Sequence, residues 1–191
     1  MRYGYRRSGA NPILIIIIIN VMLLIATYIN QGFIIRNLGL WPAFFLEQPW
    51  TIITSMFVHA GFGHLFGNML TLFFFGTYLS QLVGDRRFLT VYFGGGLLGN
   101  ILYLLLAPSF SVAVGASGAV YAVAGTLLMM RPKLRVLLYF IVPMPLWLVI
   151  LVFFVIFSFL PGVAWQAHLG GLLFGMVAGY IFRKKERSIY F

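Results

Sequence analysis

The sequence predicts an all-α polytopic membrane protein: a bundle of six transmembrane helices with both termini in the cytoplasm. Three observations lead to this fold class. Of the 191 residues, 62% are hydrophobic and 8% are charged, whereas soluble domains are near half apolar and a quarter charged. Six segments contain no Asp, Glu, Lys or Arg. If each segment crosses the membrane once, 12 of the 13 basic residues, in the loops and the termini, fall on one side of it. With no cysteine, the chain is not a disulfide-stabilised secreted module.

The six charge-free segments have the lengths of membrane-spanning helices. A helix needs about 20 residues, at ~1.5 Å per residue, to cross a hydrocarbon core of ~30 Å. Five segments fit this length and the fourth is short. Helices are expected because a bilayer offers no water to satisfy a strand edge. The predicted helices of this single domain, residues 1–191, cover residues 13–29, 64–83, 88–106, 116–130, 136–160 and 165–182.

The first two predicted helices are separated by a long loop, residues 30–62, on the outer side of the membrane. Before the loop, the β-branched run Ile13–Ile19 would suit a buried strand, but the apolar segment continues to Ile29 and lacks a partner strand. No small-residue cleavage site follows it, so it is not a signal peptide. The loop is rich in aromatic residues, including Trp41 and Trp50. We therefore expect it to be structured and partly inserted into the outer leaflet.

The fourth and fifth predicted helices depart from a regular span in different ways. Residues 116–130 cover about 22 Å, roughly 8 Å less than the hydrocarbon core. Because Arg131 fixes the inner end of this helix, its outer end should lie below the membrane surface, in a depression lined by other helices. In residues 136–160, Pro143 and Pro145 indicate a helix that is irregular or tilted near its inner start.

The charge distribution predicts the orientation of the bundle. In a soluble protein, the net charge of +10 would suggest a nucleic-acid binder. Here the basic residues precede the first helix, occupy the two inner loops and follow the sixth helix, and Arg36 alone lies on the outer side. Cytoplasmic loops of membrane proteins carry an excess of Lys and Arg. Both termini are therefore predicted to be cytoplasmic, with the lipid bilayer and no nucleic acid as a partner.

Few polar side chains remain at membrane depth, where they are costly enough to indicate function. Three of them, His64, Ser117 and His168, fall in the first turns of the second, fourth and sixth helices, which all begin on the outer side. They are thus predicted to lie at about the same depth. A serine becomes a nucleophile when an adjacent base takes its proton, and histidine is the only base at this depth. Because all three acidic residues are in loops, the pattern indicates a Ser–His dyad.

The residues around the dyad fit the same chemistry. His64 and Asn68 are four apart on one helix face and can donate hydrogen bonds to an oxyanion, as can the backbone N–H of Ser117 at a helix N-terminus. Tyr121 follows Ser117 by four residues and can stack on the base. Glycines allow the turn before the serine and a close approach of the fourth and sixth helices: Gly115, Gly118, Gly171 and Gly175.

These residues occur in three motifs that resemble those of the rhomboid intramembrane serine proteases, in their six-helix prokaryotic form. The motifs are H-L-F-G-N at His64–Asn68, G-A-S-G-A-V-Y at Gly115–Tyr121 and A-H-L-G-G-L-L-F-G at Ala167–Gly175. They occur in family order, and the resemblance extends from Pro12 to Tyr180. It implies a rhomboid-like bundle in a prokaryotic cell (inner) membrane, working without a cofactor.

The resemblance also implies a role for each matching residue. Ser117 is then the nucleophile of a serine endopeptidase and His168 is its general base. The other positions bind the oxyanion or support the base: His64, Asn68 and the Ser117 N–H as donors, and Tyr121 packed on the catalytic histidine.

Family substrates are single-pass membrane proteins, cut through an acyl-enzyme in or near a transmembrane segment. Residues 136–160 and the loop Phe159–Gln166 resemble the family's lateral gate and cap. Two positions depart from many relatives, which have an Arg at Thr51 and an acid at Gln81. Neither is predicted to do chemistry, so these departures bear on loop anchoring and stability.

Two other functions compete with a protease. A catalytically silent rhomboid-like protein that binds and escorts membrane proteins need not keep both Ser117 and His168, and this chain has both. A channel or transporter is disfavoured by the lack of an inverted repeat and of an intramembrane carboxylate.

The remaining polar residues have simpler explanations. His59 is expected to be a loop or interface residue, and Asn100 to join two helices by a hydrogen bond. Three histidines without a nearby carboxylate or cysteine make a poor metal site. The sequence leaves the substrate and the oligomeric state open.

Overall fold

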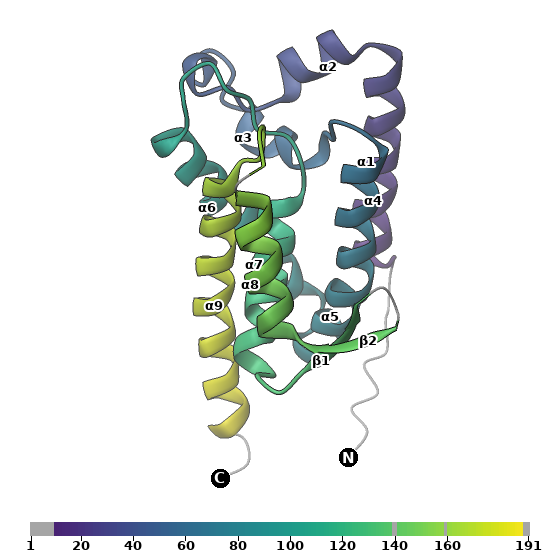
Figure 1. Ribbon diagram of the computed structural model, residues 1–191, viewed down its shortest axis with the longest axis vertical. Helices are drawn as coiled ribbons and strands as arrows, with labels where there is room; N and C mark the ends of the chain where they lie inside the picture. The colour runs from purple at the N-terminus through teal and green to yellow at the C-terminus, as the bar shows by residue number, and fades with distance from the viewer. Residues whose placement is uncertain (1–9, 139–140, 159, 189–191) are drawn as a thin grey trace.

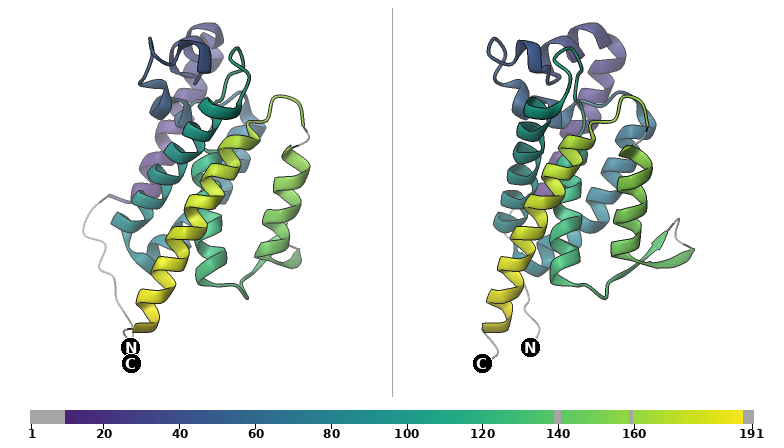
Figure 2. Two further views of the ribbon diagram at one scale, coloured as in Figure 1. Left: turned by 90° about the vertical axis from the view of Figure 1, so that its left-hand side faces the viewer. Right: turned by 60° about the vertical axis from the view of Figure 1, so that its left-hand side comes forward.

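The computed structural model describes residues 10–138, 141–158 and 160–188, which form an elongated bundle of helices (Figure 1). The long elements alternate in direction along the chain, so that the first one begins and the last one ends at the same end of the bundle (Figure 2). The predicted inner charges Arg2, Arg6 and Arg7 lie outside the described residues. The long elements are α1 (Pro12–Ile29), α4 (Phe62–Thr71), a π-helical turn (Leu72–Gly76), α5 (Thr77–Val83), α6 (Asp85–Leu106), α7 (Ser117–Met130), α8 (Leu146–Ser158) and α9 (Trp165–Ser188).

The first helix shows how the local sequence defines its ends. Asn11 caps α1, because its side-chain oxygen accepts the N–H of Ile13 at 3.1 Å and Pro12 occupies the first helical position. At the other end, the side chain of Asn30 accepts the N–H of Phe33 at 3.1 Å and so starts the next helix, α2 (Gln31–Leu38). The chain therefore turns at Asn30 from α1 into the outer loop.

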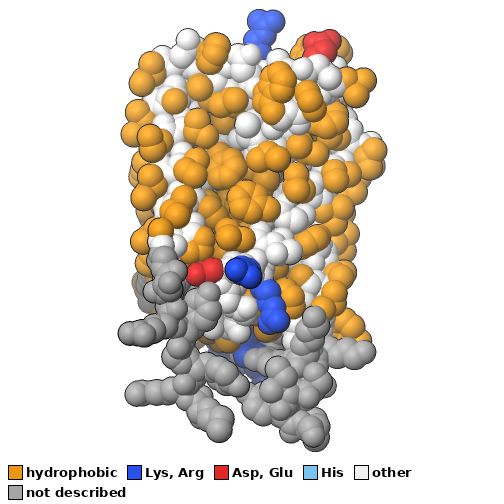
Figure 3. All heavy atoms as spheres, turned by 180° about the vertical axis from the view of Figure 1, so that it is seen from behind, with side chains coloured by type: hydrophobic (Ala, Val, Ile, Leu, Met, Phe, Trp, Pro, Cys, Tyr) orange, Lys and Arg blue, Asp and Glu red, His pale blue; other side chains and the backbone are white. Residues whose placement is uncertain are grey.

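The surface of the bundle is apolar around its middle. Exposed side chains of α1 include Ile18, Met22 and Ile25, which are 57%, 64% and 55% accessible. Figure 3 shows hydrophobic side chains covering one face, with charged side chains toward its two ends. Among the described residues, α1 and α6 are long and apolar enough to cross a membrane, and α7 is apolar but shorter. The number of crossings and the orientation remain predictions.

Residues 136–160 do not form the continuous helix that the sequence predicts. Instead β1 (Arg135–Leu138) and β2 (Val142–Pro145) pair antiparallel, with Arg135 opposite Pro145, and only Leu146–Ser158 is helical. Two prolines within four residues remove N–H donors that a helix interior needs, whereas a two-stranded hairpin tolerates them on its free edge. Pro143 and Pro145 therefore lie in the second strand of a hairpin and do not tilt a helix.

Three helices, α6, α7 and α9, pack against one another at the centre of the bundle. Most of α7 is buried, because small residues such as Ala119, Ala122 and Gly125 face neighbours on several sides. Among the described residues, α8 makes few contacts with α7 and α9, and it lies at the edge of the bundle (Figure 2). The core thus holds α7 and α9 in place, and α8 joins it through the buried side chains of Leu146 and Ile150.

The long outer loop is structured. It contains α2, the 3₁₀ turn Pro42–Phe44, α3 (Thr51–Thr54) and the 3₁₀ turn Ser55–Phe57. Leu40 and Ala113 exchange two backbone hydrogen bonds of 3.0 Å, which ties the loop to the segment before α7. At the position that departs from relatives, Thr51 is buried and its hydroxyl donates to the carbonyl of Gln48 at 2.6 Å. The loop is therefore anchored locally without an arginine. Gln81, the other departure, is exposed.

Candidate active site

Ser117 is the first residue of α7 and follows a turn at Gly115. Gly115 has a φ of 127°, in the left-handed region that favours glycine. The N–H of Gly115 donates to the carbonyl of Ser55 at 2.9 Å, and the N–H of Ala116 points to Nε2 of His59 at 3.5 Å. The first N–H groups of a helix have no intrahelical acceptor. The turn therefore presents the N–H of Ser117, next to its hydroxyl, as a donor for a ligand.

His168 lies on α9 with its imidazole against the hydroxyl of Ser117. The distance from Nε2 of His168 to Oγ of Ser117 is 2.8 Å, although 51 residues separate them. Glycines make this approach possible: a Cβ at Gly171 or Gly175 would overlap the backbone carbonyls of Gly118 or Ala122. The near-contact of α7 with α9 thus sets the distance between the two reactive side chains.

The imidazole of His168 is oriented by packing. The ring of Tyr121 stacks on it, with centroids 4.7 Å apart and planes at 28°. Nδ1 of His168 is buried and has no hydrogen-bond partner among the described residues. No carboxylate therefore orients this histidine in the described part of the chain, and the arrangement is a hydrogen-bonded Ser–His pair with a tyrosine ring stacked on the histidine.

His64 and Asn68 lie on α4, beside the turn that leads to Ser117. The ring of His64 is close to Gly115, since a Cβ there would be 2.6 Å from its Cε1. Asn68 is buried one turn further along α4, and its amide nitrogen donates to the carbonyl of His64 at 2.8 Å. Neither side chain hydrogen-bonds Ser117 directly in the described structure. The structure thus brings His64 to the turn and places Asn68 behind it.

His59 belongs to this cluster, although the sequence pattern indicated only a loop or interface residue. Its side chain is fully buried, and its ring meets that of His64 edge to face, with centroids 4.9 Å apart. Burial, followed by the nearby His64, lowers the pKa of His59 to about 3, and the backbone of Phe57 opposes this shift. A lone loop histidine gives no local sign of such burial, because the contact depends on the tertiary placement of the Ser117 turn.

Asn100 joins two helices by a hydrogen bond, as the sequence predicts. Its amide nitrogen donates to the carbonyl of Ile52 at 2.7 Å and to the hydroxyl of Ser55 at 3.0 Å. It therefore joins α6 to the short helix α3 and to the turn that follows α3 in the outer loop. Because Ser55 in turn accepts the N–H of Gly115, Asn100 supports the turn before Ser117 from below.

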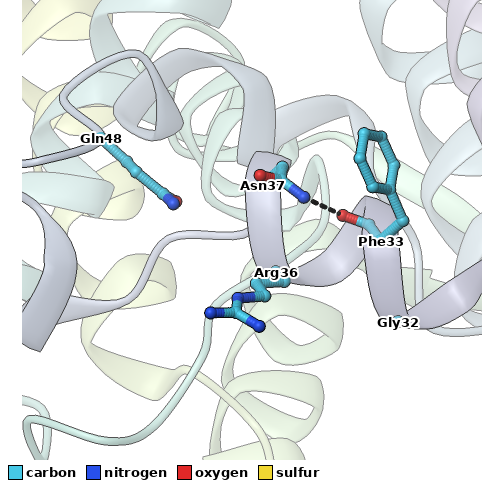
Figure 4. Close-up of a pocket in the computed structure, with 5 residues that line it drawn as sticks. All are labelled: Gly32, Phe33, Arg36, Asn37 and Gln48. Atoms are coloured by element: carbon cyan, nitrogen blue, oxygen red, sulfur yellow. Dashed lines mark hydrogen bonds between the residues drawn. The ribbon is translucent and has the colours of Figure 1, made fainter.

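Neither a metal site nor a separate pocket adds to this cluster. Within the described ranges, no group of three or more His, Cys, Asp or Glu side chains could hold a metal ion. A pocket of about 660 Å³ lies in the outer loop, away from the predicted site residues (Figure 4). It is lined by Gly32, Phe33, Arg36, Asn37 and Gln48.

The chain is similar to known proteins over most of its length. Residues 46–185 match the family model described as Rhomboid domain. YdcA, a rhomboid of Bacillus subtilis (strain 168), is 37% identical over 140 residues, covering 72% of this chain and 70% of YdcA. RHOMBOID-like protein 6, mitochondrial, of Arabidopsis thaliana is 35% identical over 150 residues, covering 74% of this chain and 46% of that protein.

A shorter match joins the chain to Rhomboid-like protease 3 of Toxoplasma gondii, which is 34% identical over 84 residues, covering 44% of this chain and 32% of the relative. The chain thus spans more than two thirds of YdcA and less than half of the other two relatives. The family match and these identities, together with the helical bundle, agree with the motifs. The chain belongs to the rhomboid family, a family of membrane-embedded proteins.

Proposed function

We propose that this chain is an intramembrane serine endopeptidase with Ser117 as nucleophile and His168 as general base. The observation that carries the proposal is the 2.8 Å distance between Nε2 of His168 and Oγ of Ser117. This is hydrogen-bonding distance for proton transfer from a serine hydroxyl. The name of the Toxoplasma gondii relative, which includes the word protease, agrees with it.

Acylation begins when Oγ of Ser117 attacks the carbonyl carbon of the scissile peptide bond. Nε2 of His168 takes the hydroxyl proton, and the carbonyl oxygen becomes an oxyanion. When the tetrahedral intermediate collapses, the C–N bond breaks and His168 gives its proton to the leaving amine. Water then attacks the acyl-enzyme ester, with His168 again taking a proton, and Ser117 is regenerated with release of the new carboxyl terminus.

The proposal assigns three donors to the oxyanion. The N–H of Ser117 stands at the start of α7, where the helix dipole also favours negative charge. The ring of His64 lies beside the same turn, and Asn68 retains a second amide proton beyond the one given to the carbonyl of His64. Removing one such donor typically lowers turnover by ~10²–10³-fold.

The proposed substrates are single-pass membrane proteins cut in or near their transmembrane segment. The sparse contacts of α8 with α7 and α9 support lateral entry of a substrate segment at the edge of the bundle. In this proposal α8 acts as the gate, and the loop between α8 and α9 covers the site from outside; Phe159 of that loop lies outside the described residues.

The finer topology is part of the same proposal. Six crossings, both termini in the cytoplasm and a prokaryotic cell (inner) membrane fit the excess of basic residues at one end of the bundle. This orientation places the Ser117 turn toward the outer face. Reporter fusions after Ser188 and within the outer loop test it: cytoplasmic activity is expected only for the first fusion, and the reverse result would contradict the orientation.

The function is tested with the full chain in liposomes and a tagged single-pass substrate. Wild type is expected to cleave it, and Ser117→Ala and His168→Ala are expected to lose cleavage. Ser109→Ala is the matched control, because this exposed serine makes no side-chain hydrogen bond in the described structure and should leave cleavage unchanged. Wild type that binds but never cleaves would instead support the catalytically silent alternative. Cleavage that survives Ser117→Ala would refute the mechanism.

A further inference from the structure

We propose that His59 is a positioning residue of this site, holding the peptide before Ser117 and the ring of His64 where the oxyanion is bound. The proposal rests on the proposed protease function, because it assigns His59 a part in that reaction. It differs from the roles of the motif residues, since His59 acts through Ala116 and His64 and touches no reacting atom.

The first contact is with the backbone. Nε2 of His59 is 3.5 Å from the N–H of Ala116, across 57 residues of sequence. An N–H donor requires an acceptor, so Nε2 must be unprotonated and Nδ1 must carry the ring proton. Nδ1 is buried without a hydrogen-bond partner among the described residues. The fold thus buries an imidazole whose Nε2 accepts a hydrogen bond from the turn before the nucleophile.

The hydrogen bond from Ala116 to His59 matters because the turn contains a glycine, whose backbone can adopt several conformations. Gly115, with its φ of 127°, has other backbone conformations within reach, and each would reorient the N–H of Ser117. Two bonds oppose such changes: Gly115 N–H to the carbonyl of Ser55, and Ala116 N–H to His59. Together they fix the peptide planes that precede Ser117.

The second contact is with the ring of His64. The two imidazoles meet edge to face at 63°, and the other side of His64 is exposed. No hydrogen bond of the His64 side chain is present in the described structure, so packing against His59 and Gly115 sets its orientation. A protonated His59 could not accept the Ala116 N–H at Nε2 and would repel a protonated His64. The lowered pKa of His59, about 3, keeps it neutral at physiological pH.

The experiment compares His59→Gln with His59→Asn in the full chain. The amide of glutamine reaches the place of Nε2 and can accept the Ala116 N–H, whereas the amide of asparagine reaches only the place of Nδ1. We expect His59→Gln to keep kcat within about 3-fold of wild type and His59→Asn to lower kcat about 10–100-fold, with KM unchanged in both. Thermal unfolding is measured in parallel, because a merely structural role would lower activity only as far as the folded fraction falls. Equal kcat in the two variants would overturn the proposal.

A second measurement needs no folded variant at His59. The chain has three histidines, so ¹⁵N-histidine labelling of wild type yields three imidazoles, assigned with His64→Ala and His168→Ala. At pH 7 the third imidazole is expected as the neutral Nδ1–H tautomer, with Nε2 shifted as a hydrogen-bond acceptor. A protonated Nε2 would overturn the proposal even if the protein cleaves substrate. Conversely, a chain that cleaves nothing while showing this tautomer would refute the protease and leave the His59 contact established.

Discussion

Replacing Gly171 by alanine should loosen the contact between α7 and α9 and weaken the whole bundle. A Cβ at Gly171 would overlap the carbonyl group of Gly118, which is backbone and cannot rotate away. Overpacking a tight contact costs about 1–3 kcal/mol, and a backbone obstacle favours the upper end. Alanine recovers about 1 kcal/mol of helix propensity relative to glycine. The expected net loss is about 2 kcal/mol, which is roughly 30-fold in the unfolding equilibrium constant.

Equilibrium unfolding in mixed detergent and SDS micelles, followed by tryptophan fluorescence, measures this loss. Gly67→Ala in α4 is the matched control, because no described atom outside its chain neighbours and the adjacent backbone of α4 lies within 4 Å of a Cβ built at Gly67. That variant should be as stable as wild type or up to about 1 kcal/mol more stable. The close-packing argument fails if Gly171→Ala matches wild type, or if both variants lose the same stability. Cleavage should fall with Gly171→Ala as well, since Ser117 precedes Gly118 directly.

Three further substitutions probe the site. Tyr121→Ala should lower kcat about 3–10-fold, because it removes the ring stacked on His168, a contact worth ~0.5–1.5 kcal/mol. Tyr121→Phe keeps the ring and should retain more of the rate. Equal rates for the two variants would exclude a stacking role. Asn68→Ala should lower turnover by ~10–10³-fold at unchanged thermal stability, and an unchanged rate would leave Asn68 a structural residue. Asn100→Leu removes two donated hydrogen bonds and leaves the hydroxyl of Ser55 without that donor. Thermal unfolding should therefore show that the free energy of unfolding falls by about 1–3 kcal/mol. Stability equal to wild type would show that the outer loop does not depend on these hydrogen bonds.

The parts of the fold that the sequence predicted well are those governed by short-range signals. α1 covers Pro12–Ile29 and α6 covers Asp85–Leu106, close to the predicted segments, because each is built on a long run without charged residues. The charged residues Asp85, Arg86 and Arg87 extend α6 by one turn beyond the predicted start. Ser117 and His168 were placed at helix starts from glycine and length patterns, and the structure brings them within 2.8 Å. Polar residues within an apolar segment are strong indicators of a functional site, because burying a polar group at membrane depth is costly.

The differences arise where a tertiary arrangement decides the outcome. In Arg135–Pro145, the length of the charge-free run favoured a helix, but Pro143 and Pro145 remove donors and the chain folds into a hairpin instead. His59 lies at the end of the outer loop, and only the fold shows that its ring lies against Ala116, far along the chain. No periodicity or local motif encodes such a contact.

Labelling by a fluorophosphonate tests most directly the claim that His168 activates Ser117. The full chain in detergent is treated with the probe, digested, and mapped by mass spectrometry. We predict a single adduct on Ser117 in wild type, the same adduct in Ser109→Ala, and none in Ser117→Ala or His168→Ala. An adduct on another serine, or undiminished labelling of Ser117 in His168→Ala, would contradict a nucleophile activated by this dyad.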